Sequence, residues 1–157
     1  MAGPTSFKKL LTKWCHKIEP KRILEWGPGE STIVMLEECA GDITTIEHDN
    51  KWYLIWKEKL DCGRCKLLLI PDDEDGPMDN YSSPPVKGKF DLIFVDGRQR
   101  VKCMNFAKEH LSPSGVVIVH DAERSEYSKG IDLFGELERD EDKGTVVLRL
   151  PLKQSNI

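Results

Sequence analysis

The chain has 157 residues, a length that suits a single domain, and 32% of them are charged. Its longest apolar runs extend over only a few residues, which excludes a membrane-spanning helix. The net charge of -4 argues against a nucleic-acid-binding protein, because such proteins present a basic surface to phosphates. Lysines near the start have no long apolar stretch behind them, so we expect no signal peptide and a cytoplasmic location.

The first predicted element is an amphipathic helix within residues 1–19, which Pro20 ends. Its apolar side chains recur at helical spacing: Phe7, Leu10, Leu11, Trp14 and Ile18. This stripe should pack on a sheet or on a second subunit, with the lysines facing outward. The helix is therefore the surface through which a homo-oligomer could form.

Apolar segments and helical patterns alternate along the rest of the chain. Strands are predicted at residues 22–26, 43–47, 65–70, 90–95, 115–120 and 145–150, and helices at about 32–39, 50–60 and 101–111. Residues 122–143 are polar, with at most a weak helix near 131–137. The alternation predicts a single α/β domain over residues 1–157, a Rossmann-like three-layer sandwich. Its mainly parallel sheet should have about six strands and be shortened at the C-terminal end.

The segment 71–89 has no periodicity and contains four prolines, so it is predicted to be a long loop where a helix would be expected. Long loops inside compact domains are often functional lids.

Five cysteines are scattered along the chain, which favours free thiols. Cys62 and Cys65 form the only pair that is close in sequence. A zinc knuckle would need a second such pair, and a redox pair normally opens a helix, whereas a strand follows here. Metal binding or redox activity at Cys62 and Cys65 remains the alternative to plain thiols.

In parallel sheets of this kind, ligands bind beyond the carboxyl ends of the strands, where the strand order reverses. Five predicted strand ends carry at least one acidic residue each: residues 25–30, 47–49, 71–73, 96–100 and 120–124. A sheet with a purely structural role does not need an acidic residue at every one of these strand ends. We therefore expect the functional site at this edge of the sheet.

The loop after the first strand reads EWGPGEST over residues 25–32. Its glycines let the backbone approach a ligand, and the following helix start offers free N–H groups. Glu47 lies twenty residues after Gly27 and could accept both hydroxyls of a ribose. Thr32 stands where a dinucleotide fingerprint has its third glycine, which disfavours a nicotinamide oxidoreductase and leaves it a weaker alternative.

Four segments together resemble class I S-adenosylmethionine-dependent methyltransferases, and in particular a branch with an E-W-G-x-G-x-S-T first motif. They are ILEWGPGEST at 23–32, TIEHD at 45–49 with Trp52 behind it, FDLIFVDG at 90–97 and GVVIVHD at 115–121. The resemblance implies the same fold, S-adenosylmethionine as cofactor, and methyl transfer.

The resemblance also implies a cofactor site. Glu25 and Gly27 would lie against the methionine part, Glu47 would hold the ribose, and His48 or Trp52 would flank the adenine. Asp72 would lie near the adenine amino group. The same site would include Trp26, Gly29, Ser31, Thr32 and Asp96.

Asp96, His120 and Asp121 close adjacent predicted strands, so their side chains could converge. Histidine is the natural general base near neutral pH, and two aspartates could hold a divalent metal such as magnesium. Similar metal-dependent O-methyltransferases carry an Asp-Asn pair after the fifth strand, whereas this chain has Asp121 and Ala122. Non-catalytic roles are the third interpretation: Asp96 would cap the next helix and His120 would be an interior residue.

Arg98, Arg100 and Arg124 lie in the same predicted loops and could clamp a phosphate or carboxylate of the acceptor, or else pair with local acids. Tyr127, Tyr81 and the 71–89 loop could cover the acceptor or serve only as structure. We therefore expect O-methyl transfer to a small polar or sugar-like molecule. The alternative is a catalytically silent S-adenosylmethionine-binding module that regulates or scaffolds a partner.

Overall fold

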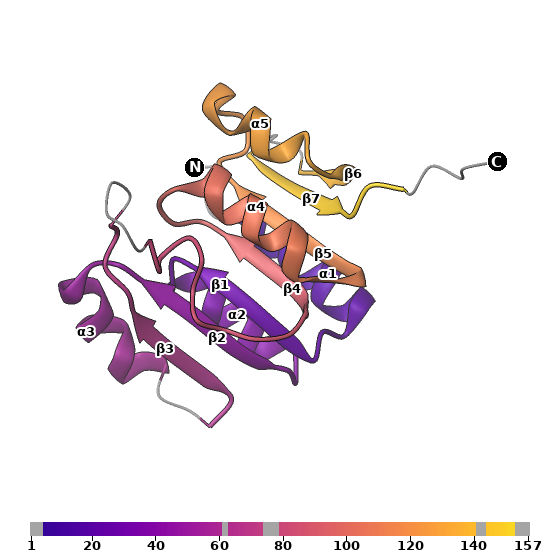
Figure 1. Cartoon of the computed structure of the whole chain (residues 1–157). Coiled ribbons are helices and arrows are strands. Elements are labelled where there is room, and N and C mark those ends of the chain that lie inside the picture. Colours follow the sequence, from indigo (N-terminus) through magenta and orange to yellow (C-terminus); the bar gives the residue numbers. More distant parts are fainter. Residues whose placement is uncertain (1–4, 61–62, 74–78, 141–143, 153–157) are drawn as a thin grey trace.

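A computed structural model describes residues 5–60, 63–73, 79–140 and 144–152. Its described strands form one sheet in the order β3-β2-β1-β4-β5-β7-β6 (Figure 1). Five neighbouring strands are parallel: β3 (Cys65–Leu69), β2 (Asp42–Glu47), β1 (Arg22–Trp26), β4 (Phe90–Val95) and β5 (Leu111–His120). Next to β5, β7 (Thr145–Arg149) pairs antiparallel with both β5 and β6 (Gly135–Arg139). The expected Rossmann-like α/β fold with a mainly parallel sheet is confirmed.

The C-terminal end of the sheet differs from the sequence prediction. A weak helix was expected near residues 131–137 and the sheet was expected to be shortened, but β6 occupies residues 135–139 and brings the sheet to seven strands. Helical structure comes earlier, in the 3-10 turn at Ser125–Tyr127 and in α5 (Ser128–Ile131). An edge strand needs few apolar side chains, because its pairing with the buried β7 supplies the stability, and this explains the polar sequence of β6.

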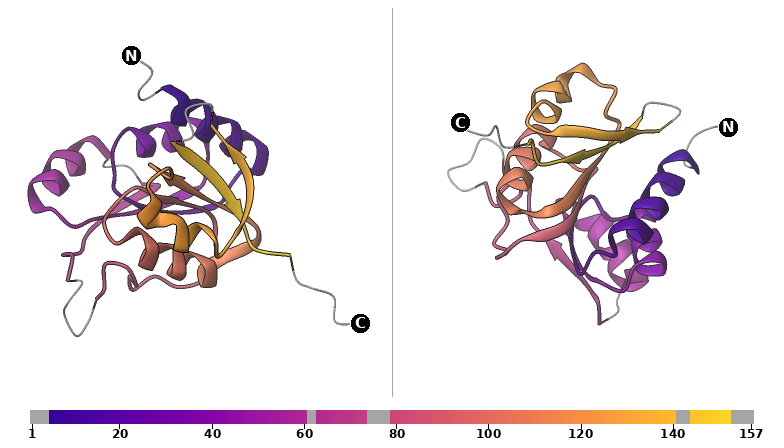
Figure 2. Two further views of the ribbon diagram at one scale, coloured as in Figure 1. Left: turned by 90° about the horizontal axis from the view of Figure 1, so that it is seen from above. Right: turned by 90° about the vertical axis from the view of Figure 1, so that its right-hand side faces the viewer.

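Helices cover both faces of the sheet (Figure 2). On one face, α1 (Thr5–Ile18) and α2 (Glu30–Glu38) bury Leu11 and Met35 against sheet residues such as Phe94. On the other face, α4 (Arg100–His110) and α5 pack against a second cluster that includes Met104 and Val95. The remaining helix, α3 (Asn50–Leu60), packs along β3 and β2. The result is the expected three-layer arrangement.

The predicted apolar stripe of α1 packs on the sheet of its own chain. Phe7, Leu11 and Trp14 are buried in the cluster of that face, and the indole Nε1 of Trp14 donates to Glu138 Oε1 at 2.9 Å. Lys13 binds the same carboxylate at 2.8 Å. The first helix is thus an integral part of the domain, and it ties the N-terminal segment to β6.

The loop predicted at residues 71–89 is described at 71–73 and 79–89, and these residues contain no helix. Tyr81 is fully buried in the cluster on the α4 face. Its hydroxyl accepts from the backbone N–H of Arg98 at 2.9 Å, and its carbonyl accepts from Trp26 Nε1 at 2.8 Å. The loop therefore covers the sheet by inserting one aromatic side chain where a helix was expected.

Two further sequence predictions concern membranes and cysteines. Over the described ranges, no helix combines the length and the apolar character that a membrane span requires. Cys62 lies outside the described residues, whereas Cys65 begins β3. The interpretation of these two cysteines as plain thiols therefore stays a prediction.

Candidate functional site

A cavity of about 780 Å³ lies at the carboxyl ends of β1, β2, β4 and β5. It spans the point at which the strand order changes from β1 to β4, where sheets of this class bind their ligands. The sequence-predicted residues in its wall are Gly27, Gly29, Ser31, Glu47, His48, Trp52, Asp96, Arg98 and His120. Residues expected to act together are thus brought to one place.

Gly27 forms the tight turn that follows β1. Its φ of 88° lies in the left-handed region, and its N–H donates to Ile46 O at 3.0 Å. A Cβ at this position would lie 2.5 Å from the carbonyl oxygen of Asp96, a distance that real Cβ atoms do not show. Only glycine therefore allows the loops after β1 and β4 to meet at the base of the cavity.

Glu25 is fully buried beneath this loop and lies outside the cavity wall. Its carboxylate accepts hydrogen bonds from Ser31 Oγ at 2.5 Å, from Thr45 Oγ1 at 2.8 Å and from the hydroxyl of Thr32. Burial raises its pKa to about 7, while the three hydroxyl donors act in the opposite direction. Glu25 thus joins β1 to β2 and to the start of α2. Trp26 and Thr32 are also fully buried and outside the wall.

Glu47 ends β2 and presents its carboxylate to the cavity, although the residue is only 4% exposed. Its Oε2 accepts from the backbone N–H groups of His48 and Asp49, both at 2.8 Å, and lies 3.1 Å from His48 Nδ1. These contacts all use one oxygen, so the carboxylate is held rigidly. Such a carboxylate can accept hydrogen bonds from a ligand through its second oxygen.

Aromatic side chains of α3 form one wall. The Nε1 of Trp52 donates to Pro28 O at 3.0 Å, which fastens α3 to the loop after β1. Trp56 packs edge-on against Trp52 with ring centroids 5.7 Å apart. Because Trp52 is 42% exposed and lines the cavity, its indole offers a flat apolar surface to a ligand.

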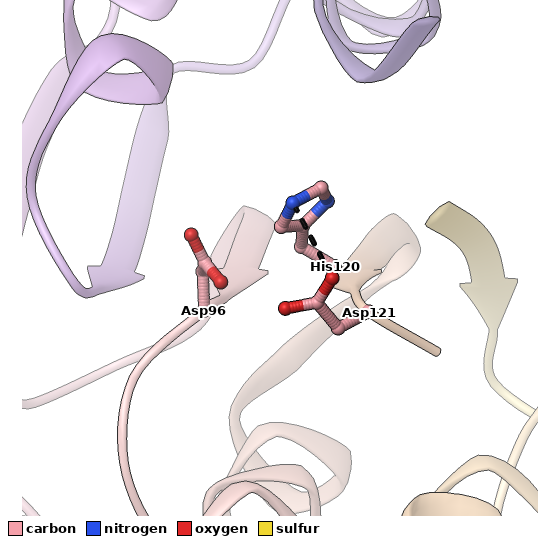
Figure 3. A group of neighbouring side chains, drawn as sticks. All are labelled: Asp96, His120 and Asp121. Carbon is pink, nitrogen blue, oxygen red and sulfur yellow. Dashed lines mark ion pairs between the residues drawn. The ribbon is translucent and has the colours of Figure 1, made fainter. Parts of the chain in front are cut away.

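At the opposite side of the cavity, Asp96 and His120 line the wall, and Asp121, which lies outside the wall, is grouped with them (Figure 3). One ligand atom from each of the three lies within 4.8 Å of the others. The imidazole is fixed from several directions: Nδ1 lies 3.0 Å from Thr145 Oγ1, Nε2 lies 3.7 Å from Asp121 Oδ1, and the ring contacts Phe7 at 5.0 Å between centroids. Asp121 has a φ of 55°, a strained conformation of the kind found at functional sites.

Arg100 lies behind this cluster and forms ion pairs with both of its aspartates. Its Nη2 lies 3.0 Å from Asp96 Oδ1 and 3.7 Å from Asp121 Oδ2. The same guanidinium donates to the carbonyls of Gly97, at 3.0 Å, and His120. Burial raises the pKa of Asp96, and the charges of His120 and Arg100 counteract that rise. Arg100 therefore pairs with local acids, one of the two roles expected for it.

Of the other predicted substrate-binding residues, Arg98 lines the cavity and the rest lie outside its wall. The Nε of Arg98 lies 3.2 Å from Asp72 Oδ2. Asp72 is itself outside the wall and also binds the side-chain amide of Gln99. Arg124 pairs with Glu126 at 4.0 Å, and Tyr127 lies under the guanidinium of Arg100 at 4.9 Å. Neither Arg124 nor Tyr127 lines this cavity.

The structure adds site residues that the sequence interpretation did not single out. Phe7 lines the cavity from α1, Trp56 lines it from α3, and Thr145 holds His120 from β7. The helical spacing from Trp52 to Trp56 could have indicated the second residue. Phe7 and Thr145 could not be found this way, because their proximity depends on how distant segments pack.

No protein-family model and no curated protein matches this chain. Solved structures do match it over nearly its whole length. A methyltransferase-like protein from Silicibacter pomeroyi is 17% identical, covers 96% of this chain and 87% of its own, and has a TM-score of 0.73. A putative O-methyltransferase from Klebsiella pneumoniae is 21% identical, with 96% and 84% covered and a TM-score of 0.73. The O-methyltransferase from Bacillus cereus, in complex with SAH, is 16% identical, with 93% and 81% covered and a TM-score of 0.73. At these identities the likeness shows the fold.

Proposed function

We propose that the protein is a class I S-adenosylmethionine-dependent methyltransferase that methylates a hydroxyl group of a small polar or sugar-like acceptor. The observation that carries the proposal is the composition of the main cavity. A glycine turn, a rigid carboxylate and an exposed indole line one side, and a histidine flanked by two aspartates stands at the other. One cavity thus unites a nucleotide-type subsite with a group that can accept a proton.

The nucleotide-type subsite fits S-adenosylmethionine. Gly27 lets the loops after β1 and β4 meet at the base of the subsite, the second oxygen of Glu47 can accept the ribose hydroxyls, and Trp52 or His48 can contact the adenine. When bound, this cofactor supplies a sulfonium-linked methyl group that is already activated for transfer. The protein then has mainly to align the acceptor, a contribution worth about 7–11 kcal/mol in favourable cases.

His120 is the proposed general base. If Thr145 holds Nδ1, then Nε2 is the nitrogen that faces the cavity and can take the proton of the acceptor hydroxyl. Asp121 lies 3.7 Å from Nε2 and stabilises the imidazolium that forms. A positioned base of this kind contributes on the order of 100- to 10,000-fold to the rate.

A divalent metal at Asp96, His120 and Asp121 is the competing interpretation, and the spacing of the ligand atoms permits it. However, the guanidinium of Arg100 already contacts both carboxylates and offsets part of their negative charge. Ala122 adds no ligand next to Asp121. The donor set therefore favours proton transfer by His120, and no step is assigned to a metal.

Two measurements test the proposal in sequence. Titration calorimetry should show binding of S-adenosylhomocysteine at least about tenfold tighter than binding of NAD, and equal or tighter NAD binding would refute the cofactor assignment. A screen with methyl-labelled S-adenosylmethionine against sugars, nucleosides, small acids and catechols should then reveal transfer. Tight S-adenosylhomocysteine binding with no methylated acceptor would instead support a silent binding module.

A further inference from the structure

A second cavity, of about 590 Å³, lies at the opposite end of the sheet from the candidate site. It is enclosed by the end of α1, the end of α2 and the turns that lead into β1 and β2. Cys15 and Cys39 both line it, together with His16 and Glu38. None of these residues belongs to the proposed methyltransferase site, so the inference drawn from them is independent of that proposal.

The two cysteines lie close together, although they are 24 positions apart in the sequence: both line this cavity, and their chain neighbours His16 and Glu38 are in contact at 2.5 Å. Cys15, in the last turn of α1, is 1% exposed, whereas Cys39 caps the C-terminus of α2 and is only partly buried. The interaction between the two thiols raises the pKa of Cys15 and lowers that of Cys39. Both are free thiols.

The surroundings favour a thiolate at Cys39. The guanidinium of Arg64 donates to Leu36 O at 2.7 Å, to Gly41 O at 3.0 Å and to the carbonyl of Cys39 itself at 3.1 Å. It thereby neutralises the carbonyls at the end of α2, which would otherwise disfavour a negative charge. The interaction with the Cys15 thiol lowers the pKa of Cys39, the Arg64 charge lowers it further, and burial and Glu38 oppose them. The Glu38 carboxylate lies 2.5 Å from His16 Nε2.

We propose that Cys15 and Cys39 form a redox site that reacts with hydroperoxides and closes to a disulfide between α1 and α2. Cys39 thiolate attacks a peroxide oxygen, the O–O bond breaks, and Cys39 becomes a sulfenic acid while hydroxide leaves and takes up a proton. The Cys15 sulfur then attacks the Cys39 sulfur, a disulfide forms, and water leaves. In total two thiols are oxidised and one hydrogen peroxide is reduced to two waters.

Cys39 is the partner that peroxide reaches first, and Cys15 is the resolving thiol. This order follows from exposure, because Cys15 is buried and Cys39 is only partly buried, and the opposite pKa shifts of the two thiols agree with it. Cys103 provides an internal comparison, since it is fully buried and burial raises its pKa.

The test treats the folded, reduced full-length protein with hydrogen peroxide and maps its peptides without reduction. The expected product is a peptide pair joined through Cys15 and Cys39. Before oxidation, Cys39 should react with N-ethylmaleimide at least about 100-fold faster than Cys103. In C15S, which lacks the resolving thiol, Cys39 should be trapped by dimedone as a sulfenic acid, and C39S should give no such adduct. A C62S/C65S variant removes the pair that is close in sequence and should still form the 15–39 bond.

Thermal unfolding supplies a readout that does not depend on chemical trapping. A cross-link across 24 residues restricts the unfolded chain, so the oxidised protein should unfold at a higher temperature than the reduced one. The C62S/C65S variant should keep this shift, and C39S should lose it. The proposal is overturned if peroxide joins only other cysteines, or if Cys39 is alkylated as slowly as Cys103.

Discussion

Thr145 Oγ1 lies 3.0 Å from Nδ1 of His120, so a buried hydroxyl on β7 holds the imidazole at the end of β5. The contact depends on the antiparallel pairing of the two strands, in which Thr145 stands directly opposite His120. It orients the ring so that the other nitrogen, Nε2, is directed to the side of Asp121. Proteins commonly fix the tautomer of a catalytic histidine by a hydrogen bond to the ring nitrogen that does not face the substrate.

The first prediction concerns catalysis by this histidine. His120→Gln should lower the turnover number by about 100-fold or more, because the base is lost while the shape is nearly kept. Affinity for S-adenosylhomocysteine should change by less than about twofold, since the predicted cofactor subsite is formed by other residues. Steady-state kinetics and calorimetry on the same preparations measure the two effects.

Thr145→Val is the matched variant for that experiment. It keeps the side-chain shape but removes the hydroxyl, so turnover should fall less than in His120→Gln and its pH profile should shift as the imidazole loses its partner. If both variants retain turnover and change only the melting temperature, His120 serves the fold and a different base must be sought.

The second prediction concerns the buried carboxyl of Glu25, whose pKa rises from 4.5 to about 7 on folding. Between these values the folded protein holds a proton that the unfolded chain has released. Stability contributed by the protonated group is therefore complete below pH 4.5 and is lost as the pH rises through about 7. The loss should be on the order of 3 kcal/mol at most.

Denaturant unfolding between pH 4 and pH 8 measures this effect. Glu25→Gln removes the titration, so the difference in unfolding free energy between wild type and variant should shrink or reverse as the pH rises. Glu37→Gln, on the exposed side of the same α2 helix, controls for the loss of one negative charge. A wild-type protein that gains stability relative to Glu25→Gln over this range would contradict the prediction.

The parallel half of the fold was predictable because its strands are buried on both faces. Ile23 and Leu24, for example, are both fully buried although they point to opposite faces, and they produce the short apolar run that the sequence shows. The strand β6 was not predictable from such a pattern. Its residues are mostly polar, and its pairing with β7 is a tertiary contact that no local periodicity reports.

For the site, sequence order predicted which segments meet but not which atoms are exposed. Glu47 and His120 stand at strand ends and line the cavity, as their positions suggested. Glu25 lies two positions deeper in the sheet, level with Thr45, and its carboxylate is used by three hydroxyl groups beneath the loop. The difference arises from this depth and from the short hydroxyl residues that surround the side chain.

The third prediction concerns the turn at Gly27. Gly27→Ala should destabilise the protein by at least about 2 kcal/mol, because alanine is strained at a positive φ and its Cβ would collide with the Asp96 carbonyl. The same shift should displace the loop after β4 and weaken S-adenosylhomocysteine binding. Gly63→Ala is the control, since a Cβ there meets nothing within 4 Å. Equal stability and affinity in the two variants would show that the loops can separate without consequence.

The fourth prediction concerns Glu47. Removing its carboxylate in Glu47→Ala should weaken S-adenosylhomocysteine binding by about 1.5–3 kcal/mol, the usual value of hydrogen bonds to a charged group. Glu47→Gln keeps an acceptor for the backbone N–H groups of His48 and Asp49, so it separates the loss of a ligand contact from the loss of local order. Calorimetry gives the affinities. Unchanged binding in the alanine variant would place the ribose elsewhere.

The last prediction separates proton transfer by His120 from metal catalysis. Arg100 supplies a positive charge 3.0 Å from Asp96 and 3.7 Å from Asp121, so a divalent cation would have to displace or repel it. A chelator should therefore leave turnover within about twofold of its starting value, and added magnesium or manganese should not raise it. Arg100→Ala removes the competing charge, and it should lower stability while making the two carboxylates more receptive to a cation, measured as a metal-dependent rise in melting temperature. Turnover of the wild-type protein that disappears with a chelator and returns with magnesium or manganese would instead assign Asp96, His120 and Asp121 to a metal centre.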